Sequence, residues 1–208
     1  NIYKNQYEDF IFQDSRIENA NKENVAYMPT SKNNRNNLEF AATFFNKDAI
    51  RKIDTFKLVK EDKSVPDNKA IYMPLIMEQY NTKLGDNIEF SYKGNIYSFQ
   101  VAGFFETTYM GVVSSGVLKY YVSDKLYQKL YENIGGATII EARMKVPDNI
   151  DNSGKYVEIQ SQQLIDDFLD KTDYLSNING IFAISNCLDK TDMKNNVFKK
   201  GRCRRWII

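Results

Sequence analysis

Hydrophobic and polar residues alternate most regularly in the middle of the chain. Every second residue is apolar between positions 88 and 92, and the same alternation returns between 97 and 101. Side chains of a strand point alternately to its two faces, so this period predicts two half-buried strands. The glycine-containing segment Lys93-Gly94-Asn95 separates them and favours a tight turn. The pattern therefore predicts a β-hairpin over residues 87–102, with its tip at 93–95.

Two later segments have apolar residues at the spacing of an amphipathic helix. The two stripes are formed by Leu126, Tyr127, Leu130 and Tyr131, and by Leu164, Ile165, Phe168 and Leu169. Ser123 and Ser161 precede these stripes, and serine is a favoured N-cap because its oxygen accepts a backbone hydrogen bond. We therefore expect one helix to begin after Ser123 and another after Ser161.

Shorter apolar runs predict the remaining strands. They cover residues 9–13, 25–28, 38–45, 70–73, 117–122 and 137–144. Residues 14–24 are polar and are expected to form a loop, whereas the apolar spacing of 48–56 suits a short helix. Strands and helices that follow no strict βαβ order favour an α+β fold.

Composition excludes several kinds of chemistry. The 208 residues are 42% hydrophobic and 26% charged, which is ordinary for a globular chain. The absence of histidine excludes Ser-His-Asp and Cys-His catalysis and histidine-based metal centres. The two cysteines, Cys187 and Cys203, are too few for a four-cysteine zinc site, although one disulfide stays open in an oxidising compartment.

Charge is distributed unevenly along the chain. Residues 199–208 contain five basic and no acidic residues; subtracting them from the totals of 28 and 27 leaves 23 basic and 27 acidic residues, a net charge of −4. A body of that charge is a poor nucleic-acid binder. The basic tail is either a membrane-adjacent segment or, as we prefer, a sequence foreign to the native chain, and the predicted fold ends at residue 198.

The chain contains no apolar run of about 18 residues, the length needed to cross a bilayer. It starts at Asn1 without a methionine or a signal peptide. We therefore expect a processed protein or a soluble piece of a larger one.

Three short patterns approach known chemical sites without matching them. Asp166 and Asp170 share a helix face, where a solvated surface explains them best. Residues 149–154 resemble half of a calcium loop, but Gln160 stands where the bidentate glutamate belongs. Residues 111–116 miss by one residue the G-x-S-x-G pattern of a serine nucleophile, and the chain has no histidine to activate that serine. We therefore predict no catalytic residue, no metal and no cofactor.

Aromatic and apolar clusters are the remaining candidates for binding. Tyr120-Tyr121, and Tyr127 with Tyr131, suit either core packing or a wall of a sugar or peptide groove. The segment Tyr109-Met110-Gly111-Val112-Val113 is apolar without a strand or helix period. We interpret it as a candidate contact loop, although burial under the β-rich region explains it equally well.

One longer pattern resembles a known family. It consists of Ala70-Ile71-Tyr72-Met73, a short helix, Leu84-Gly85-Asp86, the hairpin, and Phe99-Gln100-Val101-Ala102-Gly103. This order resembles the extracytoplasmic domain of MacB/FtsX-type ABC transporter permeases. The resemblance covers residues 56–171 and extends less closely over the first 55.

The motif residues are Leu84, Gly85, Asp86, Val101 and Gly103, and we interpret them as structural. Glycine at position 85 suits a turn with positive φ, and Asp86 can accept a hydrogen bond within its own turn. Glycine inside a strand, at position 103, indicates a bulge or a close approach of another chain segment.

The resemblance implies a two-lobed α+β domain. Residues 1–55 and 137–198 would form a porter-like α/β lobe from both ends of the chain. Residues 56–136 would form an inserted, mainly β lobe, and 199–208 would lie outside both. The N-terminal part is short and polar for this family.

The resemblance also implies a non-enzymatic role at the cell membrane, on its extracytoplasmic side. Such a domain couples ATP hydrolysis in the cytoplasm to movement or substrate handling outside. Its partners would be the transmembrane helices of the permease, through them a cytoplasmic ABC ATPase, and an envelope or peptide substrate. We expect the isolated domain to be a monomer or weak dimer that binds no nucleic acid. The alternatives are a secreted or surface-anchored peptide- or glycan-binding module, and an enzyme that uses carboxylates alone.

Overall fold

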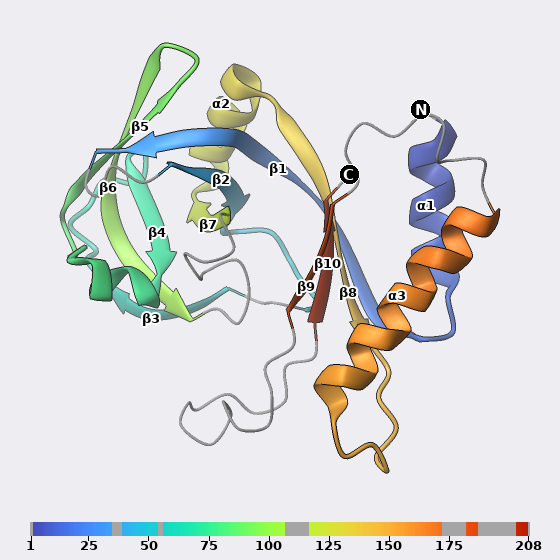
Figure 1. The fold of residues 1–208 in the computed structure, drawn as a ribbon. Coiled ribbons are helices and arrows are strands. Elements are labelled where there is room, and N and C mark those ends of the chain that lie inside the picture. Colours follow the sequence, from blue (N-terminus) through green and yellow to red (C-terminus); the bar gives the residue numbers. More distant parts are fainter. Residues whose placement is uncertain are drawn as a thin grey trace. The chain divides into compact units, whose positions relative to one another are not determined.

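The computed structural model describes residues 2–34, 39–53, 56–106, 117–171, 182–186 and 203–207. Its mixed sheet and few helices make the fold α+β, as the sequence predicts. The chain divides into two compact units, and Figure 1 shows the elements of both. Unit 1 comprises Asn1–Glu23 and Thr138–Ile208, and unit 2 comprises Asn24–Ala137. Residues 24–55, which we expected in the first lobe, therefore belong to unit 2.

Unit 2 is built around strands that curl into a closed ring. Its strands are β2 (Glu39–Asn46), β3 (Lys57–Glu61), β4 (Ala70–Pro74), β5 (Asn87–Tyr92), β6 (Asn95–Glu106), β7 (Val117–Val122) and the later part of β1 (Ile17–Asn33). Neighbouring strands follow the order β2-β7-β4-β6-β5-β1, and β3 pairs with β6. Because β1 pairs with both β5 and β2, these six strands form a small barrel (Figure 1).

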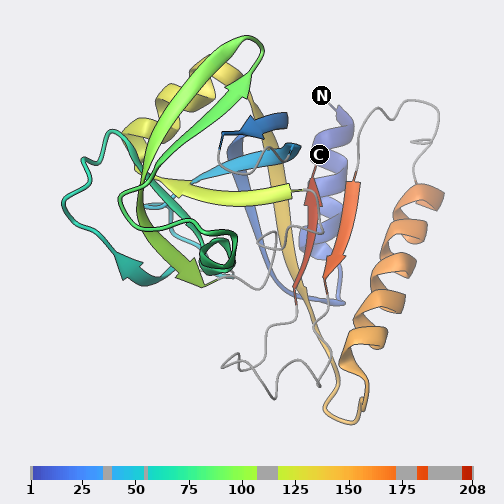
Figure 2. The ribbon, with the colours of Figure 1, turned by 60° about the vertical axis from the view of Figure 1, so that its left-hand side comes forward.

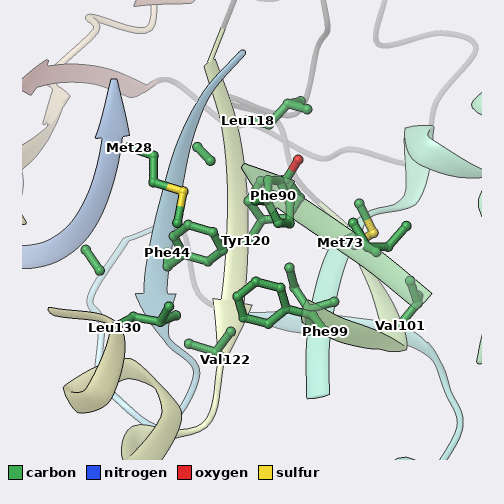
Figure 3. Packing of buried hydrophobic residues seen from close by; sticks show 14 of the residues in the cluster. Met28, Phe44, Met73, Phe90, Phe99, Val101, Leu118, Tyr120, Val122 and Leu130 are labelled. Atoms are coloured by element: carbon green, nitrogen blue, oxygen red, sulfur yellow. The ribbon is translucent and has the colours of Figure 1, made fainter. Parts of the chain in front are cut away.

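The interior of this barrel is filled by aromatic and aliphatic side chains. The ring of Phe44 lies 5.5 Å from those of Phe99 and Tyr120 and 5.6 Å from that of Phe90, measured between centroids. Figure 3 shows these rings meeting from different strands. Helix α2 (Asp124–Ile134) adds Leu130 and two further buried side chains to the same core. Burial of such large rings makes this cluster the main source of stability in unit 2.

Unit 1 combines a sheet with two helices. It contains α1 (Ile2–Gln13), the first part of β1, β8 (Gly136–Met144), α3 (Ser153–Lys171), β9 (Phe182–Asn186) and β10 (Cys203–Ile207). Strand β10 pairs antiparallel with β8 on one side and β9 on the other, and Figure 2 shows β9 beside β10. Ile11 of α1, Ile140 of β8 and Leu164 of α3 share one buried cluster. Residues 203–207, part of the basic tail, thus form a strand of this sheet.

The hairpin prediction is confirmed with a tighter turn. β5 and β6 pair antiparallel from Tyr92↔Asn95 to Asn87↔Gln100. Asn95 therefore belongs to the strand, and the turn consists of Lys93 and Gly94, which have φ of 48° and 77°. These left-handed conformations are typical of the two-residue turns that match strand twist. The predicted strand at 117–122 is β7, and the Ser123 hydroxyl caps α2 by accepting from Leu126 N–H at 3.3 Å.

Three local predictions are wrong at the N-terminal end. Residues 9–13 belong to α1 instead of a strand, residues 14–24 lie mostly in β1 instead of a loop, and the described part of 48–56 contains no helix. The polar stretch of β1 forms a strand because pairing within the sheet satisfies its backbone groups, and Lys22 forms an ion pair with the largely buried Glu8. Neither interaction leaves a periodic signal in the sequence.

Helix α3 begins earlier than predicted. Ser161 lies inside it, where its hydroxyl donates to the carbonyl of Val157 at 2.6 Å. The side-chain oxygen of Asn152 accepts from Lys155 N–H at 2.9 Å and caps the first turn. The segment 149–154, which resembles half of a calcium loop, thus contains the start of this helix. Among the described residues, no helix has both the length and the apolar character needed to cross a bilayer.

Candidate functional site

The family-like motif of unit 2 is centred on the turn before β5. Gly85 has φ of +81°, a conformation that favours glycine, as expected. Its N–H donates to the carbonyl of Val101 at 2.8 Å, and Val101 N–H donates to the carbonyl of Asp86 at 2.9 Å. The turn is therefore bonded directly to the returning strand β6.

Side chains reinforce this connection. One carboxylate oxygen of Asp86 accepts from Lys83 N–H at 2.8 Å, and the Gln100 amide donates to the carbonyl of Gly85 at 3.1 Å. Leu84 is partly buried and packs against the aromatic core. The packing of Leu84 and the hydrogen bonds of Gly85 and Asp86 thus fix the position of the turn, which is a structural role.

Gly103 lies where β6 is in close contact with two other strands. A Cβ at this position would be 2.7 Å from the Lys60 carbonyl oxygen and 2.8 Å from Cδ1 of Tyr72. The register between β4 and β6 shifts by one residue between Ile71 and Tyr72, which leaves Ala102 as the extra residue of a bulge. Gly103 thus follows the bulge directly and lies at the close approach, the two features that a strand glycine indicates.

Those of the other candidate residues that the structure describes do not converge on a site. The contact loop 109–113 and the segment 114–116 lie outside the described residues. Tyr120 and Tyr121 are buried in unit 2, as is most of Tyr127, so these three rings are core. Tyr131, the other member of the second pair, is 36% exposed, and its ring centroid lies 5.9 Å from that of Tyr127. Asp166 is exposed and accepts from the Gln162 amide at 2.9 Å.

A cluster of cations and rings was not predicted. Lys119 of β7 is fully buried, and its Nζ lies 4.2 Å from the ring centroid of Phe45 and 4.8 Å from that of Tyr121. The guanidinium of Arg51 lies 4.9 Å from the Tyr121 ring and donates to the Asn46 carbonyl at 2.6 Å. Cation–π attraction and these bonds hold the segment after β2 against the barrel. The pattern around Lys119 resembles any half-buried strand, so the sequence carries no signal for it.

Two buried tyrosines of unit 2 have shifted acidities. Burial raises the pKa of Tyr72 to about 12, and the nearby Glu61 carboxylate, which accepts from its hydroxyl at 3.3 Å, adds to this. Burial alone raises the pKa of Tyr120 well above its ordinary value. Both phenols therefore stay neutral at physiological pH. Within the part of the chain that the structure describes, no three cysteine, aspartate or glutamate side chains are arranged to hold a metal ion.

Comparison with known proteins finds similarity only among solved structures. No family model matches the chain, and no curated protein matches it. The extracellular domain of the noncanonic ABC-type transporter YknZ from Gram-positive bacteria aligns with 69% of this chain and 74% of its own, at 13% identity and a TM-score of 0.35. The periplasmic region of MacB from Actinobacillus actinomycetemcomitans aligns with 84% of this chain and 83% of its own, at 13% identity and a TM-score of 0.33. Both structural neighbours are extracytoplasmic domains of ABC-type transporters, the kind of domain that the sequence motif resembles.

Proposed function

We propose that this chain is the extracytoplasmic domain of an ABC transporter permease subunit and has no catalytic activity of its own. In this role it faces the outside of the cell membrane and is attached to the transmembrane helices of the permease. A cytoplasmic ATPase subunit drives those helices, and the domain converts their movement into substrate handling outside. It binds neither metal nor cofactor nor nucleic acid.

The observation that carries this proposal is the bond between the Leu-Gly-Asp turn and the Val-x-Gly strand. The sequence resemblance rests on these two segments, which are separated by the whole hairpin. In unit 2 they are direct partners, through Gly85 and Val101 on one side and Asp86 and Val101 on the other. The two segments of the motif bond to each other and therefore form one structural element. Their joint resemblance to the permease domains is more specific than the resemblance of either segment alone.

The division of the chain gives further support. Unit 1 draws on both the first and the last part of the chain, and unit 2 is inserted between them. The permease resemblance likewise implies a lobe inserted between two parts of the other, but with an insertion that begins at residue 56 instead of residue 24. The non-enzymatic part of the proposal is supported by the motif residues, whose polar groups are used within their own turn.

Location can be tested in cells that make the full-length protein from its gene, with Cys187 and Cys203 replaced by serine. Ile50 is fully exposed, whereas Ala42 is fully buried. A membrane-impermeant maleimide should label Ile50→Cys in intact cells and should not label the matched control Ala42→Cys. Labelling of Ile50→Cys only after lysis would place the domain in the cytoplasm and would end the proposal.

A second measurement separates a permease from a secreted or surface-anchored binding module. Purification of the full-length protein from detergent-solubilised membranes should bring with it an ATP-hydrolysing subunit. Labelling from outside without an associated ATPase would favour the binding module.

The contact loop can be tested in the same cells. The double substitution Met110→Ser with Val112→Ser should lower transport and leave the thermal unfolding of the domain unchanged.

A further inference from the structure

Strand β6 has one edge that is covered over only part of its length. On one side β5 pairs with residues 95–100. On the opposite side β4 pairs with β6 only from Gln100 onward. Among the described residues, no strand pairs with 95–99 on the β4 side. The first half of β6 therefore presents a free strand edge.

Two residues present backbone groups at this edge. Gln100 N–H donates to the carbonyl of Lys69 at 2.8 Å, so it points away from β5 and toward the β4 side. Backbone direction alternates along a strand, so the N–H and C=O groups of Ser98 and Ile96 point the same way. The described part of the chain provides no backbone partner for either residue on this side. These groups lie where the next strand of a sheet would bond.

A cavity lies along this edge. It has a volume of about 510 Å³, and helix α2 forms its other wall with Leu126 and Lys129. Most of its lining residues come from β6 and α2, and Figure 1 labels both elements. Its apolar side chains include Ile96, which is 66% exposed, and Leu126, which is half-buried. A large exposed aliphatic side chain beside free backbone groups is typical of a surface that binds an extended segment.

The side chains that line the cavity are positively charged or neutral, which favours an acidic segment over a basic one. Lys69 and Lys129 are exposed and line it, with asparagines between them, and no acidic residue contributes to its lining. The chain outside the basic tail has a net charge of −4, so a lining with two lysines and no acid differs from its surroundings. Such a surface attracts carboxylates and repels basic segments.

We propose that the groove between β6 and α2 binds an extended acidic peptide segment by strand addition to β6. Backbone groups of the segment bond to those of Ile96 and Ser98 and continue the line of β4. One apolar side chain of the segment packs on Ile96 and Leu126, while flanking carboxylates face Lys69 and Lys129. This goes beyond the proposed function, because the binding can be measured on the isolated chain whatever protein it is part of.

The test uses a fluorescein-labelled peptide, Gly-Glu-Val-Glu-Val-Glu-Gly, and fluorescence anisotropy with the 208-residue chain. The matched probe replaces each glutamate by lysine. We expect the acidic peptide to bind about tenfold or more tightly than the basic one, because two lysines line the groove. Equal binding of the two peptides, or binding of neither, would overturn the proposal.

Two changes in the protein test the mode of binding. Lys69→Glu with Lys129→Glu should weaken binding of the acidic peptide by about tenfold, whereas Lys125→Glu, on α2 outside the groove, should change it by less than about twofold. Ser98→Pro removes an N–H that the β5 ladder does not use, so it should weaken binding about fivefold and preserve the fold.

A measurement without substitution covers the case in which Ser98→Pro fails to fold. Hydrogen exchange of the unchanged chain should show slower exchange at the Ile96 and Ser98 amides when the acidic peptide is added. Peptide binding that leaves both amides unprotected, or that persists in the Lys69→Glu and Lys129→Glu variant, would overturn strand addition at this edge.

Discussion

The N–H of Gly85 donates to the carbonyl of Val101 across 2.8 Å, which links the turn before the hairpin to the strand that follows it. The link closes the hairpin at its base, as the Lys93-Gly94 turn closes it at its tip. A rigid hairpin keeps the free edge of β6 in one position relative to α2. The motif that resembles permease domains and the groove that we propose as a peptide site thus depend on the same short hydrogen-bonded segment.

Replacing Gly85 by alanine should destabilise unit 2 by about 1–2 kcal/mol. The cost is conformational, because φ is +81° and the nearest atom to an added Cβ, Oδ2 of Asp62, is 3.8 Å away. Urea unfolding followed by the near-ultraviolet circular dichroism of the tyrosines measures it, since the aromatic core lies in unit 2. Gly85→Asn should recover part of the loss, because asparagine tolerates positive φ better than alanine. Equal losses for the two variants would contradict a conformational cause.

Gly103→Ala should also destabilise unit 2, by about 1–3 kcal/mol, for a steric reason. An added Cβ would be 2.7 Å from a backbone oxygen, that of Lys60, which cannot move without disturbing β3. Asparagine is larger than alanine and should therefore be worse here, the opposite order to that at Gly85. The same urea measurement distinguishes the two sites, and an improvement from alanine to asparagine at 103 would show that crowding is not the cause.

Ser123→Ala should cost about 1 kcal/mol, since the hydroxyl caps α2. The Ser123 hydroxyl oxygen accepts from Leu126 N–H at 3.3 Å, and its O–H donates to the Asp67 carbonyl at 3.2 Å. The exposed Ser91→Ala is the control and should change the free energy of unfolding by less than about 0.5 kcal/mol. If both substitutions had the same effect, the cap would contribute nothing.

The accuracy of the sequence predictions depends on whether each element is determined locally. The hairpin was predictable because one face of β5 and β6 is buried and the turn needs a residue such as Gly94. The strand at residues 17–24 was not, because pairing with a distant part of the chain satisfies its polar groups. Helix α3 was predicted too short because the Asn152 cap lies in a segment that also resembles a metal-binding loop.

The same distinction applies to the candidate sites. Gly85 and Gly103 were predictable because glycine itself signals unusual backbone geometry. The groove was not, because the free edge of β6 results from the offset between β4 and β5, which only the register determines. In the sequence, Ile96 and Lys129 are ordinary surface residues of a strand and a helix.

Stability at high pH should depend on Tyr72. Its pKa is about 12 in the folded protein, because of burial and the Glu61 carboxylate, and about 10 in an unfolded chain. Below about pH 10 both states hold the proton, and the contribution of this phenol to stability is fully present. Between about pH 10 and 12 the unfolded chain loses the proton first, so the free energy of unfolding falls as pH rises.

Tyr72→Phe should therefore make the loss of stability between about pH 10 and 12 less steep, and should remove one ionisation near pH 12 from the tyrosinate absorbance. Glu61→Gln provides the intermediate case, because it removes the carboxylate that faces the phenol at 3.3 Å but leaves the ring buried. Its effect on the slope should be smaller than that of Tyr72→Phe, since burial is the larger cause of the raised pKa. If the slope were unchanged in Tyr72→Phe, Tyr72 would lose its proton at the same pH in the folded and the unfolded protein. Burial would then not raise the pKa of this phenol.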